Sequence, residues 1–268
     1  MQAALTEQEF RQFQAMIYQI AGISLSNEKK ALVSGRLAKR VNHYRLTNYG
    51  DYFRLLASPE TPQELQIAVD LLTTNETYFF REPKHFDLLR DTILPPLKTA
   101  GRPVRIWSGA SSSGEEIYTI AMVMAQVLGD RNWEIIGSDI STRVLETAKL
   151  GHYPIERAKD IPRELLSKHC LKGVGAQEGT FLIDKPLRSR CQFLQVNLNT
   201  TLPKLGEFDV IFLRNVMIYF DMKTKQQVVA RMLPLLRSGG YFLVSHSESL
   251  NGITDALKVV SPSVYRKP

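Results

Sequence analysis

A run of small residues followed by two acids is the first part of the sequence that could do chemistry. It reads "IWSGASSSGEE" and spans 106–116. Its composition is that of a nucleotide-binding turn, but the G-x-G-x-x-G spacing of such turns is missing. The N-terminus of a helix that begins after Gly114 would attract a pyrophosphate, whereas Glu115 and Glu116 would repel it. The run therefore indicates a ligand that carries a positive charge.

An aspartate at the end of the next apolar run adds a second candidate ligand group. Asp139 closes "IIGSD", where open α/β folds use a carboxylate to accept hydrogen bonds from a ribose diol. A ligand with a ribose, an ammonium group and no phosphates would suit both features. S-adenosylmethionine is the common cofactor of that description. The alternative interpretation of Asp139 is a simple helix N-cap.

Two further segments place polar side chains at the ends of apolar runs. They read "LLTTNETYFFREP" and "VIFLRNVMIYFD", and the first lies where a helical region meets the strand-containing region. Their candidate site residues are Asn75, Thr77 and Arg81 in the first and Arg214, Asn215 and Tyr219 in the second.

The first part of the chain reads as helices only. "TEQEF" and "TPQEL" match the S/T-x-x-E/Q capping box, with Thr6 and Thr61 as predicted N-caps, Glu9 and Glu64 at the third helical position and Pro62 at the first. We therefore predict an all-α N-terminal domain over residues 1–75.

From Val104 onward, apolar strand-like runs alternate with helical patterns. This order predicts an α/β domain over residues 76–268, with a largely parallel, Rossmann-like sheet covered on both faces and a terminal hairpin that contains one antiparallel strand. The predicted strands lie at 104–110, 134–140, 191–197, 208–215, 241–246, 257–260 and 264–266, and the predicted helices at 114–128, 141–150 and 222–237. A glycine-bearing stretch at about 171–191 predicts a small β subdomain, or else a flexible loop.

The composition is that of an ordinary soluble protein of 268 residues, and the chain is basic, with a net charge of +7 and a pI near 9.4. The excess charge indicates an acidic partner, such as nucleic acid, anionic lipid or an acidic protein face. Much of it lies on one amphipathic segment, 29–45, beside the apolar positions Val33, Leu37, Val41 and Tyr44. Its basic stripe consists of Lys29, Arg36, Lys39, Arg40 and His43.

Sequence features also indicate the cellular compartment. Cys170 and Cys191 lie in no metal-ligand pattern, so we expect free thiols and no metal site. No signal peptide and no membrane-spanning run is visible. We expect a monomeric, cytoplasmic protein that does not insert into the membrane.

Six motifs taken together resemble a known family. They are "LTTNETYFFRE", "IWSGASSSGEE", "GSDIS", "VNL", "FLRNVMIYFD" and "HSES". In this order they are similar to the bacterial chemotaxis receptor methyltransferases, the CheR family, and the likeness covers nearly the whole chain. It implies transfer of a methyl group from S-adenosylmethionine to receptor glutamates, which yields glutamate methyl esters and S-adenosylhomocysteine.

The resemblance also implies roles for individual residues. Asn75, Thr77 and Arg81 would line the cofactor cleft, Glu115 would bind the methionine ammonium, Asp139 the ribose, Asn197 and Leu198 would flank the adenine, and Arg214 and Asn215 would complete the pocket. Arg81 and Tyr219 would be catalytic, nearest the transferred methyl group. The substrate-binding candidates are Lys29, Arg36, Lys39 and Arg40, facing the helical cytoplasmic domain of a receptor. A receptor C-terminal peptide could add a strand to the β insertion, and the receptors would recruit the enzyme to membrane arrays.

Two alternatives remain open at this stage. The high pI is compatible with a nucleic-acid methyltransferase, although "RNVMIYF" lacks the Asp/Asn-Pro-Pro-aromatic turn used on exocyclic amines and the basic residues are not interleaved with exposed aromatics. A non-catalytic adaptor would keep the fold and the receptor contact. Measurable binding of S-adenosylmethionine would argue against the adaptor.

Overall fold

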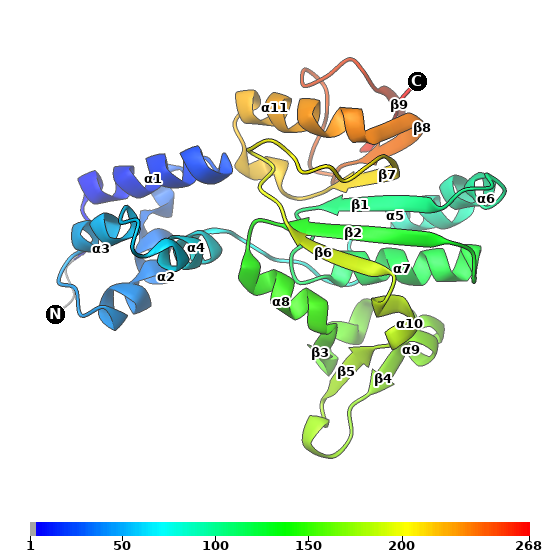
Figure 1. Ribbon diagram of the computed structural model, residues 1–268, viewed down its shortest axis with the longest axis horizontal. Helices are drawn as coiled ribbons and strands as arrows, with labels where there is room; N and C mark the ends of the chain where they lie inside the picture. The colour runs from blue at the N-terminus through cyan, green and yellow to red at the C-terminus, as the bar shows by residue number, and fades with distance from the viewer. Residues whose placement is uncertain (1–3) are drawn as a thin grey trace.

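The computed structural model describes residues 4–268 and shows a helical part next to an α/β part (Figure 1). The helical part begins inside the predicted domain, whose first three residues lie outside the described chain. It consists of α1 (Glu7–Ala21), α2 (Lys30–His43), α3 (Tyr49–Leu56) and α4 (Pro62–Leu72). A linker over 73–82 then leads to α5 (Pro83–Leu88). The predicted boundary at residue 75 falls within this linker.

Of the two predicted capping boxes, one forms and one does not. At α1, the backbone N–H of Glu9 donates to the Thr6 hydroxyl and the Glu9 carboxylate accepts from the Thr6 N–H. Helix α4 begins at Pro62 as predicted, but the Thr61 hydroxyl donates to the Leu55 carbonyl instead of capping it. The capping box predicted at Thr61 is therefore wrong, because Glu64 turns into the core of the domain.

The main sheet of residues 4–268 has seven strands in the order β6-β2-β1-β7-β8-β10-β9. Strands β6, β2, β1, β7 and β8 pair in parallel, whereas β10 is antiparallel to both β8 and β9. This confirms the predicted parallel sheet with its antiparallel terminal hairpin. The strands are β1 (Val104–Gly109), β2 (Trp133–Asp139), β6 (Cys191–Gln195), β7 (Phe208–Leu213), β8 (Leu236–Leu243), β9 (Lys258–Ser261) and β10 (Val264–Arg266).

Helices cover both faces of this sheet. On one face, Val228 and Met232 of α11 (Met222–Met232) pack with Trp107 of β1. The other face carries Ile106 and is covered by α5, α6 (Leu94–Leu97) and α7 (Glu115–Leu128), while α8 (Thr142–Leu150) contacts β6 and β2. The predicted helix at 222–237 ends early, because the chain from 236 onward forms β8.

A small second sheet projects below the main one (Figure 1). Its order is β3-β5-β4, with β3 (His152–Pro154), β4 (Cys170–Lys172) and β5 (Thr180–Ile183) all paired antiparallel. The inserted subdomain thus starts near residue 152 and not at 171, and it includes the helices η3 (Ile155–Asp160), α9 (Arg163–His169) and α10 (Lys185–Arg188). Strands β4 and β5 lie within the predicted β subdomain, whereas the third strand, β3, lies before it and had no signal of its own in the sequence.

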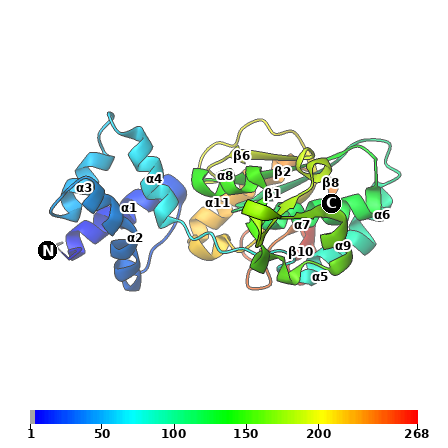
Figure 2. The same ribbon diagram turned by 90° about the horizontal axis from the view of Figure 1, so that it is seen from below.

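Polar contacts join the helical part to the α/β part, and the separation and linker between them are visible in Figure 2. Asp70 of α4 accepts hydrogen bonds from the N–H groups of Thr142 and Arg143, at the N-terminus of α8. A carboxylate is favourable there because of the unpaired N–H groups and the helix dipole. On the other side, the Asn197 amide donates to the Ile20 carbonyl, and Tyr18 donates to Asp221. These contacts hold the helical part and the α/β part in a fixed position relative to each other.

No helix in residues 4–268 combines the length and the apolar character needed to cross a lipid bilayer. Both cysteines are free thiols, and burial raises the pKa of each.

Candidate functional site

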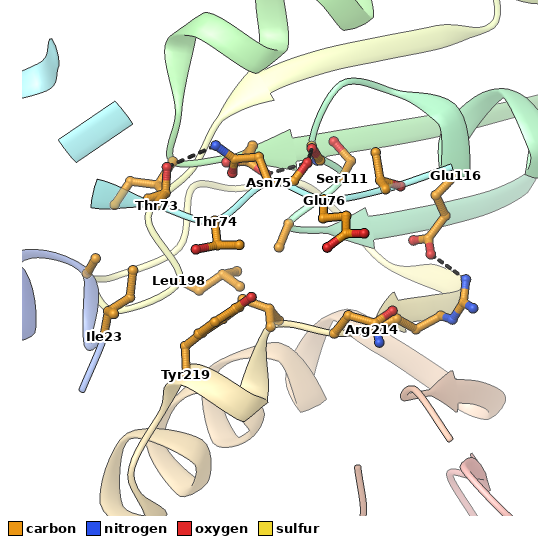
Figure 3. A pocket seen from close by; sticks show the side chains of 18 of the residues that line it. Ile23, Thr73, Thr74, Asn75, Glu76, Ser111, Glu116, Leu198, Arg214 and Tyr219 are labelled. Atoms are coloured by element: carbon orange, nitrogen blue, oxygen red, sulfur yellow. Dashed lines mark hydrogen bonds and ion pairs between the residues drawn. The ribbon is translucent and has the colours of Figure 1, made fainter. Parts of the chain in front are cut away.

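A pocket opens between the helical part and the carboxyl ends of β1, β2 and β7 (Figure 3). The flanking strands β2 and β7 lie on opposite sides of β1, so the pocket is at the point where the strand order reverses, the usual ligand position in open α/β sheets. Its empty volume is about 850 Å³, open solvent at the mouth included. That size suits a small organic ligand.

Most of the residues predicted for the cofactor cleft and for catalysis lie on the walls of this pocket, although they come from distant parts of the sequence. Those on the walls are Asn75, Thr77, Arg81, Asp139, Asn197, Leu198, Arg214, Asn215 and Tyr219. The wall of the pocket does not include Glu115.

The two acids of the loop after β1 point in different directions. Glu115 is 1% exposed, accepts a hydrogen bond from the Ser113 hydroxyl at 2.6 Å, and lies 3.3 Å from Arg157. Glu116 lies on the pocket wall. Successive helical residues are about 100° apart, so only one of the two can face the pocket. The structure therefore gives no support for Glu115 as the ammonium ligand, because Glu116 and not Glu115 lies on the pocket wall.

Arg214 is the central charge of the pocket wall. Its side chain is 1% exposed and pairs with Glu116 at 2.6 Å and Glu82 at 3.0 Å. It also donates to the Arg81 carbonyl oxygen. One buried guanidinium thus ties together the linker, the start of α7 and the end of β7. Because two carboxylates face one cation, this end of the pocket keeps a net negative charge.

Asp139 lies at the end of β2, where it organises the loop after β1. One carboxylate oxygen accepts from the Ser112 N–H and the other from the Ser141 N–H, both at 2.9 Å. Burial raises the pKa of Asp139, and these backbone bonds partly offset the rise. Each oxygen keeps a second lone pair, so the carboxylate retains capacity to accept from a ligand hydroxyl.

Left-handed backbone conformations concentrate around the pocket. Ala110 and Ser112, in the loop after β1, have φ of 61° and 51°, and Asn215, after β7, has φ of 59°. Such conformations cost residues with a Cβ about 1–3 kcal/mol and persist where the surroundings fix them, often at functional sites. In this loop they turn the Ser112 N–H toward Asp139.

The amide groups of the predicted asparagines are partly occupied by the protein itself. The Asn75 side-chain amide donates to the Thr73 hydroxyl, and the backbone carbonyl oxygen of Asn75 accepts from the Ser112 hydroxyl. The side-chain nitrogen of Asn197 donates to the Ile20 carbonyl of the helical part, and its side-chain oxygen accepts from the Asn199 N–H. Hydrogen bonds within the protein thus hold both side chains in place on the pocket wall.

Arg81 and Tyr219 differ in how firmly they are held. The Arg81 guanidinium donates to the Glu76 carbonyl at 3.0 Å and lies over the Tyr78 ring, 5.6 Å from its centre. For the Tyr219 hydroxyl, no hydrogen-bond partner is found among residues 4–268. Both side chains are half-buried and line the pocket. Arg81 has further N–H groups available, and Tyr219 has a free hydroxyl.

Two buried polar atoms in the pocket wall lack a partner within the described chain. They are the Ser111 hydroxyl oxygen and Nε of Arg214. Buried polar groups without partners are uncommon and often mark a missing ligand or water. Together with the charged end, they indicate a polar ligand with both donor and acceptor groups.

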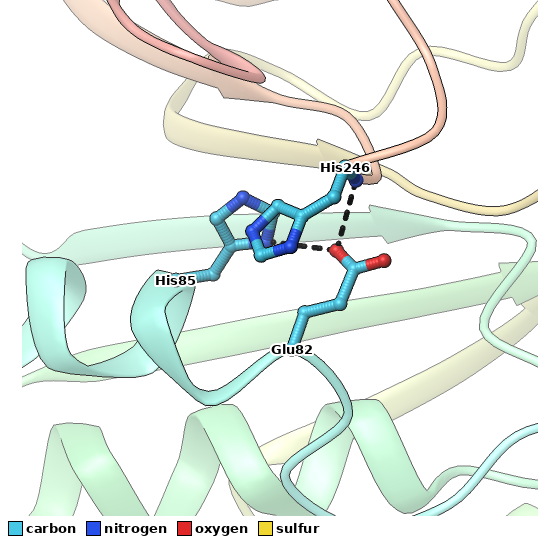
Figure 4. A group of neighbouring side chains, drawn as sticks. All are labelled: Glu82, His85 and His246. Atoms are coloured by element: carbon cyan, nitrogen blue, oxygen red, sulfur yellow. Dashed lines mark hydrogen bonds and ion pairs between the residues drawn. The ribbon is translucent and has the colours of Figure 1, made fainter.

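Behind Arg214, Glu82, His85 and His246 lie close together (Figure 4). These three side chains are of the types that hold metal ions, and their nearest ligand atoms lie within 4.8 Å of one another. However, the Glu82 oxygen that lies 3.4 Å from Nδ1 of His85 already accepts from Arg214 and from the His246 N–H. A divalent cation would face the Arg214 guanidinium there. The geometry fits better with a structural role, in which His85 and His246 hold Glu82 and Glu82 orients Arg214.

His85 should make stability depend on pH. Burial, with the nearby Arg214 charge, lowers the pKa of His85 to about 4. The unfolded chain, with a His pKa near 6.5, binds a proton between those values that the folded chain does not, so stability falls as pH drops from about 6.5 toward 4. Between pH 7.5 and pH 5, the free energy of unfolding measured with urea should fall further in the wild type than in His85→Gln, by up to about 2 kcal/mol. Equal differences in the two proteins would contradict this assignment.

Two arginines of the predicted basic stripe are engaged within the protein. Arg40 pairs with Glu64, which is 2% exposed and also accepts from Tyr52. Arg36 donates to the carbonyls of Leu72 and Thr73 at the end of α4. Their guanidinium groups therefore stabilise the fold, and the structure gives no support for either as a substrate ligand. Lys29, Lys39 and His43 are exposed.

The predicted site residues do not include three acids that support the site. Besides Glu82 and Glu116, Glu248 accepts hydrogen bonds from the N–H groups of Asn215 and Ser245, so it ties the loop after β7 to the loop after β8. All three acids lie inside the quoted motifs "FFRE", "SGEE" and "HSES", and Glu116 is also one of the two acids that indicated a positively charged ligand.

Comparison with known families covers both parts of the chain. Residues 8–73 match the family described as "CheR methyltransferase, all-alpha domain", and residues 75–266 match "CheR methyltransferase, SAM binding domain". The domain that carries the pocket is therefore the one that binds S-adenosylmethionine in this family.

Curated relatives extend over nearly the full length. The chain is 41% identical to chemotaxis protein methyltransferase 2 of Pseudomonas aeruginosa, with 97% of this chain and 93% of the relative covered. It is 39% identical to the chemotaxis protein methyltransferase of Escherichia coli, with 98% and 91% covered. For the Borreliella burgdorferi protein of the same name, identity is 34%, with 98% and 95% covered. The chain belongs to the CheR family of S-adenosylmethionine-dependent chemotaxis methyltransferases.

Proposed function

We propose that this protein transfers the methyl group of S-adenosylmethionine to glutamate side chains of chemotaxis receptors, as a protein-glutamate O-methyltransferase. The observation that carries the proposal is that both Arg81 and Tyr219 lie on the wall of the cofactor pocket. Arg81 offers a cation for a carboxylate, and Tyr219 offers a hydroxyl.

The residues on the pocket wall fit the cofactor. Asp139 can accept from the ribose hydroxyls, and the apolar side chains of Ile140, Val196 and Leu198 provide a surface for the adenine. At the other end, Glu116 can accept from the ammonium group. The unpartnered Nε of Arg214 adds a donor for the carboxylate. When bound, the cofactor supplies an activated methyl group on a sulfonium, which is its own leaving group.

The protein needs to contribute little acid–base chemistry to this reaction. A glutamate has an ordinary pKa near 4.3, so the incoming carboxylate is already ionised at neutral pH and no general base is required. What the protein must supply is orientation and exclusion of water. Arg81 would hold one oxygen of the incoming glutamate and leave the other free to attack. Tyr219 would act as a second, weaker donor.

A single incubation tests this function. The protein is mixed with methyl-labelled S-adenosylmethionine and cytoplasmic fragments of chemotaxis receptors, and the label is then treated with mild alkali. A glutamate methyl ester would release its label as methanol. Alkali-stable label on the protein, or stable N-methyl label on added nucleic acid, would contradict the proposal and favour the alternative function.

The receptor would contact the enzyme at two places. The helical cytoplasmic domain of the receptor, with its glutamates, would lie across the pocket mouth. A C-terminal receptor peptide could add to β4, because the order β3-β5-β4 leaves β4 at an edge of the small sheet. Such contacts would recruit a cytoplasmic enzyme to the membrane arrays.

The exposed lysines of the helical part should govern the salt dependence of methylation. We expect the double variant Lys29→Ala/Lys39→Ala to lower receptor methylation by about 3- to 10-fold at low salt, and by much less at high ionic strength, because exposed charges act mainly by steering. The Michaelis constant for S-adenosylmethionine should stay unchanged. A rate that is independent of salt in both proteins would argue against this surface.

A further inference from the structure

Arg157 lies outside the cofactor pocket, on η3 of the inserted subdomain, yet it contacts two segments that build the pocket. It donates to the Thr77 carbonyl oxygen at 2.7 Å and lies 3.3 Å from the Glu115 carboxylate. Thr77 is on the pocket wall, and so is Glu116, the neighbour of Glu115. Arg157 therefore connects the linker over 73–82 to the N-terminus of α7.

A second side chain of the same subdomain supports the loop at this position. Tyr153 of β3 is 2% exposed and donates to the Ser113 carbonyl oxygen at 2.7 Å. Next to it, Gly114 has a φ of 95°, and a Cβ there would lie 2.9 Å from that of Ala148 and 3.0 Å from the Tyr153 hydroxyl. The loop after β1 is thus held closely by residues of the insertion and of α8.

Arg157 also pairs with the buried carboxylate of Glu115. Burial raises the pKa of Glu115, while the Ser113 hydroxyl and Arg157 act in the opposite direction. A buried carboxylate without a charge partner is costly. The pair therefore helps to keep the first turn of α7 in place, and Glu116 with it.

We propose that Arg157 is a positioning residue, which raises the affinity of the pocket for S-adenosylmethionine by holding the linker against the N-terminus of α7. Arg157 itself does not line the pocket, so this effect requires no contact with the cofactor. Because Arg157 reaches out from the inserted subdomain, cofactor affinity depends on the position of that subdomain.

The test is the affinity for S-adenosylhomocysteine, measured by calorimetry on the full chain without receptor. Arg157→Ala should weaken binding by roughly 3- to 10-fold, a partial loss because the Arg157 side chain is 48% exposed. Arg157→Lys, which keeps one cationic donor, should recover part of the loss. The matched control is Arg163→Ala, an exposed arginine on α9 of the same subdomain, which should bind like the wild type.

A second pair of variants separates the two contacts of Arg157. Glu115→Gln removes the ion pair but keeps the Thr77 contact, so Glu115→Gln/Arg157→Ala should bind more weakly than Glu115→Gln alone. Urea unfolding of each variant shows whether stability and affinity change together. The proposal is overturned if Arg157→Ala unfolds more easily but binds within twofold of wild type, or if Arg163→Ala loses as much affinity. Should Arg157→Ala not fold, wild-type affinity in Arg157→Lys and in the Glu115→Gln/Arg157→Lys double variant would overturn it.

Discussion

Arg214→Met is expected to reduce cofactor affinity by at least about 100-fold and to lower the free energy of unfolding by about 3–5 kcal/mol. The side chain of Arg214 is 1% exposed, and it pairs with Glu82 and Glu116 at the negative end of the pocket. Removing the cation leaves two half-buried carboxylates that repel each other. Glu116 would then no longer be held on the pocket wall, and the donor at Nε would be lost.

The control for this variant is an ion pair at the opposite end of the sheet. Arg237 of β8 pairs with Asp209 at 2.8 Å, and Asp209 is 3% exposed. Arg237→Met should also destabilise the protein but should leave the affinity for S-adenosylhomocysteine unchanged. Calorimetry and urea unfolding on both variants separate the two effects. Wild-type affinity in folded Arg214→Met would show that the pocket wall does not depend on this guanidinium.

Local sequence patterns predicted the strands and helices well where interactions between residues close in the sequence determine them. The strands around the pocket are short apolar runs, and the helix after Gly114 follows directly from its spacing. The failure at Thr61 shows the limit of such patterns. There the capping box competes with a tertiary partner, because Glu64 is drawn to Arg40 and Tyr52 of the neighbouring helices. A four-residue pattern contains no information about those partners.

The site residues illustrate a related limit. Glu115 and Glu116 are chemically identical neighbours, and the one that faces the pocket is decided by the rotation of α7 about its axis. That rotation is set by how residues such as Ile117 and Tyr118 pack into the core. Only the position of the whole helix in the fold distinguishes the two acids, so the choice between them needed the structure.

The basic stripe shows the same limit for charges. Helical periodicity predicted which face of α2 is buried: Val33, Leu37 and Val41 are fully buried, whereas Tyr44, just after the helix, is half-buried. It could not show that Arg36 reaches the end of α4 or that Arg40 meets a buried acid, because those partners lie far away in the sequence. Counting the cations of a predicted helix therefore overestimates how many of them are free to bind a partner.

Arg81→Ala should depress receptor methylation far more than Tyr219→Phe. Loss of the guanidinium removes the group that would orient the incoming carboxylate, and misplacement by about 1 Å can cost roughly 100-fold in rate. Tyr219→Phe removes one neutral hydrogen bond, worth about 0.5–1.5 kcal/mol, so we expect a loss of roughly 2- to 12-fold. The measurement is kcat and KM for a receptor fragment at saturating S-adenosylmethionine.

Because Arg81 also lies on the cofactor wall, its role must be separated from cofactor binding. Affinity for S-adenosylhomocysteine, measured on the same preparations, provides this separation, and Arg81→Lys tests whether an ammonium group can replace the guanidinium in holding one carboxylate oxygen. If Arg81 orients the glutamate, the rate at saturating cofactor falls much more than the affinity does. Equal and negligible effects in Arg81→Ala and Tyr219→Phe would remove both residues from the reaction, and the carboxylate would then have to be oriented by the receptor itself.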